Sequence, residues 1–267
     1  MRLKAKVFGI ISIKGGVGKT AVSANLGVAL SQFKKKTLIV DADFSSPNLA
    51  MCFGILKPIK TINQVFKGKI TPFEAIHEYT ENLDLLPSAM MSDKLDPYLL
   101  KEKIKILRDH YDYIIIDSSP TLNDEMLATI LASDEIFVVT SPDYPTLSAT
   151  LHATKVAKKE NTAITGLILN RVRKKNFELT VEDIEEASSV PIVAVLQEDL
   201  TVPMSVAHTT PSTMLKPTAK TSVEFMKLGA SIVNEEYQDP RFLAKIRNLF
   251  MNEVKKEEIN RQLLRNN

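Results

Sequence analysis

The chain has 267 residues, of which 44% are hydrophobic and 25% are charged, and its formal net charge is +2. This composition is typical of a globular protein with one sizeable core, and so small a charge by itself favours neither nucleic acid nor an anionic membrane as a partner. The single cysteine, Cys52, excludes an internal disulfide framework and fits a reducing cytoplasm. No apolar stretch has the length of a membrane-spanning helix.

Apolar, β-branched runs alternate with amphipathic stretches along the chain, beginning with a run that leads into a glycine-rich loop and is therefore a strand, not a signal peptide. The predicted strands cover 6–13, 37–40, 83–86, 113–116, 135–140, 164–169 and 192–196, and predicted helices cover 21–31, 97–109, 123–132, 146–160 and 181–187. This order predicts a doubly wound, mostly parallel sheet with helices on both faces. We expect one such domain over residues 1–239 and a tail over residues 240–267.

The loop after the first strand reads KGGVGKT over residues 14–20. Glycines allow backbone N–H groups to converge on one anion, and the following helix N-terminus adds partial positive charge. Lys19 is expected to reach the β- and γ-phosphates of a nucleotide, and the Thr20 hydroxyl is expected to hold Mg²⁺. The predicted phosphate contacts are Gly15, Gly16, Val17, Gly18, Lys19, Thr20 and Ala21.

Carboxylates follow two of the later strands, at the edge where ligands bind in parallel sheets. Asp41 and Asp43 follow the strand at 37–40, where they either face the same Mg²⁺ or act as turn acids that cap the next helix. Asp117 ends a fully apolar strand, a costly position unless the carboxylate serves a cation or a hydrogen-bond network. It is therefore a Walker-B-like residue that contacts Mg²⁺ through water.

The loop has a second lysine, Lys14, and Ile13 stands where the general phosphate-loop pattern has glycine. This form resembles the deviant Walker A loop of the MinD/ParA ATPases, and the resemblance extends over residues 5–235. It implies that Lys14 reaches the partner's nucleotide in an ATP-sandwich homodimer, and that Asp43 orients the attacking water. Ala21 departs from the threonine of most members, and we expect this to cost at most about 1 kcal/mol of affinity, the worth of one hydrogen bond. The predicted catalytic residues are Lys14, Lys19 and Asp43, and the predicted metal-site residues are Thr20, Asp43 and Asp117.

The strand at 164–169 bears on the identity of the base. It leads into Asn170 and Arg171 and lacks the Thr/Asn-Lys-x-Asp signature of related GTPases. An asparagine amide both donates and accepts hydrogen bonds, which suits adenine. The resemblance also places Asn170 near the adenine and the 197–199 loop beside it. ATP is therefore the predicted nucleotide, with base contacts at Asn170, Arg171 and Glu198.

The cysteine count and the tail indicate which branch of the family this chain resembles. One cysteine is too few to ligate the clusters of the iron–sulfur relatives. Five apolar residues share one face of a predicted basic helix, which resembles the membrane-targeting helix of MinD: Phe242, Leu243, Ile246, Leu249 and Phe250. Alternatives left open are a helix docked on the body of the protein and a helix that binds a partner helix.

The resemblance is closest to MinD-like members. It implies an ATPase that dimerises with ATP, binds the inner face of the membrane through residues 241–254, and hydrolyses ATP slowly unless an activator protein stimulates it. One alternative is a ParA-like partitioning ATPase that binds DNA nonspecifically through basic clusters at 171–175 and 34–36. Another is a metal-insertion accessory ATPase, which would need Cys52 to pair across a dimer.

Overall fold

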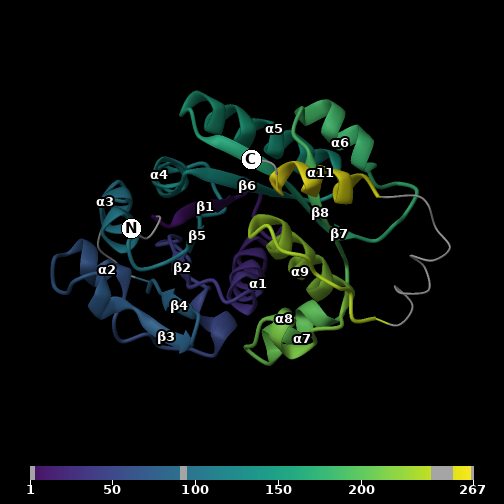
Figure 1. The fold of residues 1–267 in the computed structure, drawn as a ribbon. Coiled ribbons are helices and arrows are strands. Elements are labelled where there is room, and N and C mark those ends of the chain that lie inside the picture. Colours follow the sequence, from purple (N-terminus) through teal and green to yellow (C-terminus); the bar gives the residue numbers. More distant parts are fainter. Residues whose placement is uncertain (1–3, 91–94, 242–254, 266–267) are drawn as a thin grey trace.

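The computed structural model describes residues 4–90, 95–241 and 255–265. An eight-stranded sheet runs through the centre, in the order β3-β4-β2-β5-β1-β6-β7-β8, with helices on both faces (Figure 1). Every neighbouring pair is parallel except β3 and β4, so the predicted fold class is confirmed. The strands are β1 Lys6–Ile11, β2 Thr37–Asp41, β3 His77–Thr80, β4 Leu83–Leu86, β5 Tyr113–Asp117, β6 Glu135–Thr140, β7 Ala163–Val172 and β8 Ile192–Gln197.

Helices α1 and α9 pack side by side on one face of the sheet, and α3, α4, α5 and α6 cover the other (Figure 1). Their bounds are α1 Lys19–Gln32, α2 Ile62–Phe66, α3 Leu99–Leu107, α4 Asp124–Ala132, α5 Tyr144–Lys159, α6 Val181–Ser188, α7 Thr201–Ala207, α8 Ser212–Leu215, α9 Lys220–Ile232 and α11 Lys256–Arg265. Short 3-10 helices lie at Ala50–Phe53 and Phe73–Ala75.

The central strand β5 shows why its sequence is continuously apolar. Ile115 packs on the side of α1 and α9, whereas Ile114 and Ile116 pack on the side of α3 and α4, and all three are fully buried. A parallel strand covered on both faces has no solvent side to mark with polar residues. The structure contains every β-strand predicted in the sequence analysis, with ends that differ by a few residues.

The differences have local causes. The first strand ends at Ile11, because Ser12 already belongs to the phosphate loop. Strand β7 continues to Val172 through an irregular pairing with β8. The sequence HEYT of β3 alternates between half-buried and exposed residues at the edge of the sheet, so it carries little apolar signal.

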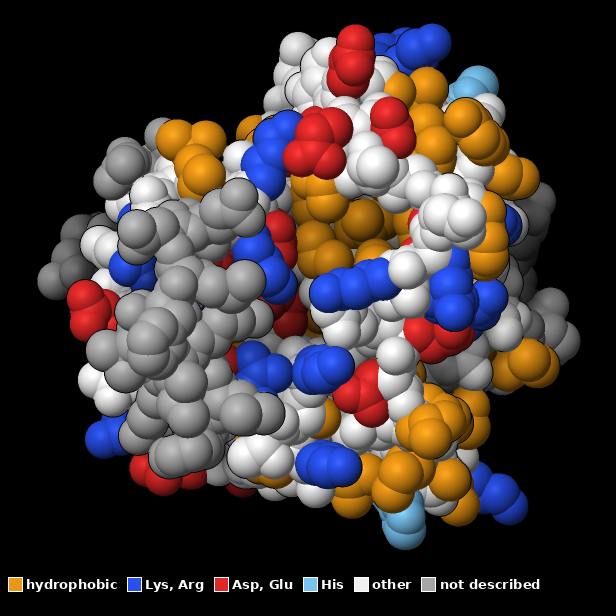
Figure 2. Space-filling model, turned by 90° about the vertical axis from the view of Figure 1, so that its right-hand side faces the viewer, with side chains coloured by type: hydrophobic (Ala, Val, Ile, Leu, Met, Phe, Trp, Pro, Cys, Tyr) orange, Lys and Arg blue, Asp and Glu red, His pale blue; other side chains and the backbone are white. Residues whose placement is uncertain are grey.

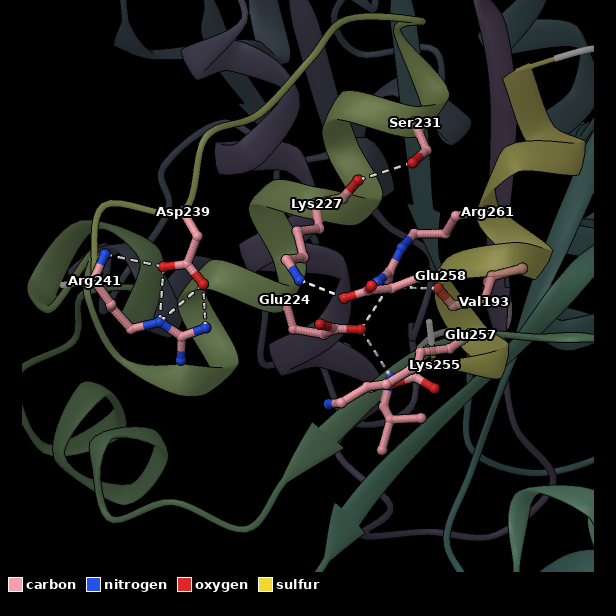
Figure 3. Close-up of polar contacts among 11 residues, drawn as sticks. Val193, Glu224, Lys227, Ser231, Asp239, Arg241, Lys255, Glu257, Glu258 and Arg261 are labelled. Carbon is pink, nitrogen blue, oxygen red and sulfur yellow. Dashed lines mark hydrogen bonds and ion pairs between the residues drawn. The ribbon is translucent and has the colours of Figure 1, made fainter. Parts of the chain in front are cut away.

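Helix α11 packs against β8 and α9 through charged side chains (Figure 3). Arg261 is 4% exposed, donates to the Val193 carbonyl over 2.9 Å and pairs with Glu224 of α9. Lys227 and Glu258 form a second pair at 2.6 Å. Residues 256–265 are thus docked on the sheet, whereas the predicted amphipathic stretch at 242–254 lies outside the described residues.

A candidate nucleotide-binding site

The loop between β1 and α1 has the backbone of a phosphate cradle. Gly16 and Gly18 have φ values of +78° and +94°, which only glycine adopts without strain. In the described chain no side chain caps α1, and a Cβ on Gly15 or Gly16 would meet no atom within 4 Å. The first N–H groups of this 14-residue helix thus have no side-chain cap, and the loop beside them is open, which fits an anion.

Asn170, near the end of β7, is hydrogen-bonded to this loop. Its side-chain amide donates to the Val17 carbonyl over 2.7 Å. A methyl group on Gly18 would come within 2.4 Å of the same amide nitrogen, so the loop and Asn170 fit only with glycine at position 18. The amide nitrogen of Asn170 thus holds the loop, and a contact between Asn170 and adenine stays a prediction.

Lys19 lies against Asp117, the last residue of β5. The Lys19 ammonium is 2.9 Å from one carboxylate oxygen of Asp117, and the Ser23 hydroxyl donates to the same oxygen over 2.8 Å. Lys19 is 6% exposed and Asp117 1% exposed. The pair connects the start of α1 to the end of the central strand.

The two aspartates after β2 have different environments. Asp41 is fully buried and accepts the backbone N–H groups of Asp43, at 3.1 Å, and Leu49, at 3.2 Å. Burial, with the nearby Asp117 charge, raises the pKa of Asp41 to about 8. Asp41 therefore acts as a turn acid, because Leu49 directly precedes the helix Ala50–Phe53.

Asp43 lies at the cavity wall. Its carboxylate accepts the Ser46 N–H over 2.9 Å, which closes a tight turn over residues 43–46. Burial raises the pKa of Asp43, against the opposing effects of the Ser46 hydrogen bond and the Lys19 charge. A partly desolvated carboxylate on the wall of this cavity is suited to orient water.

A cavity of about 530 Å³ opens above the loop, a volume in the range of small-molecule sites. Apolar side chains of Met51, Leu56 and Val206 form part of its wall. The described residues include no group of three His, Cys, Asp or Glu side chains that could hold a metal ion by themselves. A hard cation here would complete its oxygen ligands from phosphate and water, as Mg²⁺ does. Predicted site residues in the wall are Lys14, Gly16, Val17, Gly18, Lys19, Thr20, Ala21, Asp43 and Arg171, with Asn48 and Cys52 beside them.

Some predicted residues lie elsewhere. Asp117 is behind Lys19, outside this wall. Glu198 pairs with Arg173 on an exposed surface, which lowers the pKa of the Glu198 carboxyl, and it is not part of the wall. Gly15 lines a second cavity, of about 240 Å³, between the loop and residues 141–143. The base contact of Glu198 stays a prediction.

Lys14 occupies the border between the two cavities. Its ammonium is 3.1 Å from Asp143 and 2.8 Å from the Thr146 hydroxyl, at the start of α5. Burial opposes ionisation of Asp143, but hydrogen bonds from Ser141, Thr146 and Lys14 outweigh it and lower the pKa to about 2. Lys14 itself is 42% exposed, so solvent reaches this pair.

The sequence analysis did not identify three residues of the site. Ser23 shares the Asp117 carboxylate, and its place four residues after Lys19 on one helix face was a usable signal. Asp143 and Thr146 hold Lys14. Asp143 follows the carboxyl end of β6, where ligands of parallel sheets gather, so its position was also a signal.

A parallel sheet with a glycine-rich loop, a lysine at the helix start and an aspartate ending the adjacent strand defines a P-loop nucleoside-triphosphatase. A family model described as an AAA domain matches residues 5–165. The chain is 35% identical over 208 residues to the septum site-determining protein MinD of Thermotoga maritima, covering 72% of this chain and 76% of that protein. It is 34% identical over 239 residues to an uncharacterized ATP-binding protein of Methanocaldococcus jannaschii, covering 88% and 90%.

Solved structures agree. The cell division ATPase MinD of Pyrococcus furiosus superposes with a TM-score of 0.82 at 34% identity, covering 86% of this chain and 99% of that one. MinD of Pyrococcus horikoshii, solved as a complex with Mg-ADP, gives 0.81 at 33% identity, covering 91% and 98%. The chain belongs to the MinD/ParA family of P-loop ATPases. It is therefore an ATPase that uses ATP and Mg²⁺.

Proposed function

We propose that this ATPase is a MinD-type switch, which dimerises with ATP and is used for spatial positioning at the inner, cytoplasmic face of a membrane. The observation that carries the proposal is the position of Lys14. Its ammonium lies at the open border of the nucleotide cavity, held by two side chains at the start of α5 and exposed to solvent. A lysine at this border is available to the nucleotide of a second subunit placed against the same face.

The contacts of Lys14 suit a group that changes partners. An ion pair between solvent-exposed side chains is worth about 0–1 kcal/mol, so the pair with Asp143 opposes release of the ammonium only weakly. A γ-phosphate carries more negative charge than one carboxylate and would be the stronger partner. ATP, but not ADP, would therefore draw Lys14 across the interface.

Within one subunit the remaining groups have separate tasks. Lys19 would exchange Asp117 for the β- and γ-phosphates, and the loop N–H groups would bind the same oxygens. Asp43 would orient the attacking water. When bound, Mg²⁺ would neutralise charge on the phosphates, with Thr20, Asp43 and Asp117 as the nearby oxygen donors. An activator protein would be needed for rapid turnover.

The membrane part of the proposal rests on the sequence of residues 241–254 and on the MinD relatives. In the described residues no helix is both long enough and apolar enough to span a bilayer. Peripheral binding by two weak anchors in one dimer is far firmer than binding by one, which would couple membrane attachment to ATP. Hydrolysis would then release both anchors together.

A DNA-bound partitioning ATPase is the second candidate, and the charge distribution favours it less. Arg173 is paired with Glu198, and Lys35 is 3.2 Å from Glu235. On the face shown in Figure 2, Lys and Arg side chains lie among Asp and Glu side chains. Nonspecific DNA binding needs a surface where positive charge predominates.

A metal-insertion ATPase is disfavoured by the environment of Cys52. Burial, with the charges of Asp117 and Asp41, raises the pKa of this thiol to about 11. A metal ligand must be the thiolate, and these surroundings oppose its formation.

Two measurements on the full chain test the proposal. Light scattering should show a dimer with Mg-ATP and a monomer with Mg-ADP, and Lys14→Ala should stay monomeric with ATP. Lys105→Ala, on exposed α3, is the matched control and should dimerise normally. Anionic liposomes should sediment the protein only with ATP, and Phe250→Asp should abolish this. ATP-dependent sedimentation of the protein with DNA, and not with liposomes, would favour the partitioning alternative.

A further inference from the structure

Glu125, in the first turn of α4, is hydrogen-bonded to the segment that follows β2 beside the nucleotide site. One of its carboxylate oxygens accepts the backbone N–H of Phe44 over 3.2 Å, and the other accepts the Ser45 hydroxyl over 2.7 Å. Phe44 and Ser45 directly follow Asp43. Glu125 is not among the residues that line the nucleotide cavity. Its contacts are made to the backbone turn that carries Asp43.

The turn over residues 43–46 also has supports within its own segment and the core. Asp43 closes it by accepting the Ser46 N–H, and the Phe44 ring packs edge-on against Phe66, 5.2 Å between ring centres. These contacts fix the shape of the turn and its attachment to the core. The two hydrogen bonds of Glu125 join the turn to the first turn of α4 and so help to set its direction relative to that helix.

The residue that caps this same end of α4 leads back to Asp117. Asn123 caps the helix by accepting the Met126 N–H over 3.0 Å, and its amide donates to the Ser119 hydroxyl over 3.1 Å. Ser119 is two residues from Asp117, the partner of Lys19. Hydrogen bonds at both Asn123 and Glu125, joined by the backbone of α4, therefore link the loop after β5 to the turn after β2.

We propose that Glu125 is a positioning residue for ATP hydrolysis, which holds the Asp43 turn in register with the loop after Asp117. The inference rests on the proposed role of Asp43 in orienting water. When a γ-phosphate draws Lys19 from Asp117, movement of the 117–119 loop reaches Asp43 through Asn123 and Glu125. Loss of Glu125 leaves the nucleotide contacts in place and lets Asp43 drift from the attacking water.

The simpler role for an acid at this place is stabilisation of the helix N-terminus. Asp124 offers a matched control, because it precedes Glu125 in the same first turn and points to the Tyr98 hydroxyl, 3.2 Å away on the exposed surface. Both acids interact with the same helix dipole, but only Glu125 contacts the Asp43 turn. A purely structural role predicts equal effects of the two alanine substitutions.

The experiment compares Glu125→Ala, Glu125→Gln and Asp124→Ala in steady-state ATP hydrolysis by the full chain. Glu125→Ala should lower kcat about tenfold or more, because small misplacements of reacting groups are costly, and leave KM for ATP within about twofold. Glu125→Gln should retain most of the activity, since its oxygen can accept from Phe44 and its amide can donate to the Ser45 hydroxyl. Asp124→Ala should match the wild type.

Hydrogen exchange supplies a second readout. Peptides covering residues 43–49 should differ between Mg-ADP and Mg-ATP in the wild type, and Glu125→Ala should lose that difference. If Glu125→Ala folds poorly, Ser45→Ala removes one of the two hydrogen bonds from an exposed position and should lower kcat in the same direction.

Equal kcat values for Glu125→Ala and Asp124→Ala would overturn the inference, as would a kcat for Glu125→Gln as low as that of Glu125→Ala. A wild-type chain without ATP-dependent dimerisation would instead contradict the proposed function. The two failures are distinguishable, because the kcat values of the variants are compared with that of a wild type that dimerises and hydrolyses ATP.

Discussion

The Lys19 ammonium and the Asp117 carboxylate form a buried ion pair, 2.9 Å apart, beneath the phosphate loop. The Ser23 hydroxyl binds the same carboxylate oxygen, so Asp117 keeps one hydrogen bond when Lys19 moves. A bound phosphate and Asp117 therefore compete for one ammonium. This competition connects nucleotide binding to the end of β5 and to the loop that follows it.

Replacement of Lys19 tests both halves of that relationship. Lys19→Ala should abolish ATP binding, measured by titration calorimetry, because the loop loses the lysine expected to bind the β- and γ-phosphates. It should also lower the free energy of unfolding by about 3 kcal/mol, since it leaves a buried carboxylate without its charged partner. Unchanged stability in urea would show that Ser23 and water satisfy Asp117 alone.

Replacement of Asp43 should separate binding from hydrolysis. Asp43→Ala should bind ATP normally and accumulate as a dimer, while single-turnover hydrolysis falls about a hundredfold, as expected for loss of a group that positions or activates water. Light scattering with ATP and release of phosphate are the two measurements. Wild-type turnover in this variant would remove Asp43 from the reaction.

Asp143 should restrain Lys14 in the single subunit. Asp143→Asn keeps a good helix N-cap but loses the charge that pairs with the lysine. The ATP concentration for half-maximal dimerisation should fall about two- to threefold, the scale of an exposed ion pair. Asp183→Asn, in the first turn of α6, is the control and should change nothing. Weaker dimerisation of Asp143→Asn would mean that Asp143 supports the interface instead.

The nucleotide site could be located from the sequence because the residues that indicate it are close together in the chain. A glycine-rich loop after a strand and an aspartate at a strand end carry their chemistry within a few residues, as at Lys19 and Asp117. The partners of Lys14 could not be found in this way, because Asp143 is 129 residues away and the contact depends on β1 and β6 being neighbours. Glu125 was equally hidden, since nothing in its own segment indicates the Asp43 turn.

The buried Asp41 should make the folded protein less stable as pH rises, the opposite of the usual effect of a carboxylate. Its folded pKa of about 8 lies above the unfolded value of 3.8, so the folded state holds a proton that the unfolded state has lost between these limits. Stability should therefore fall as pH rises from about 5 to 8. Urea unfolding of the nucleotide-free protein measures it. Asp41→Asn, which keeps an acceptor oxygen, should flatten the slope, and an identical slope in the variant would assign it to another group.

Arg261 should be the residue on which docking of α11 depends. Arg261→Met leaves the Val193 carbonyl and the Glu224 carboxylate without their shared donor, which should cost about 3 kcal/mol of unfolding free energy. Arg265→Met is the control on the same helix, because Arg265 is exposed and makes one bond to the Glu235 carbonyl; its effect should stay within about 0.5 kcal/mol. Faster hydrogen exchange of β8 in Arg261→Met alone would show that the guanidinium also protects the edge of the sheet.

Equal stabilities of the two variants would contradict this prediction. They would mean that the contacts of Lys227, Asn260 and Leu264 hold α11 on the body of the protein without Arg261.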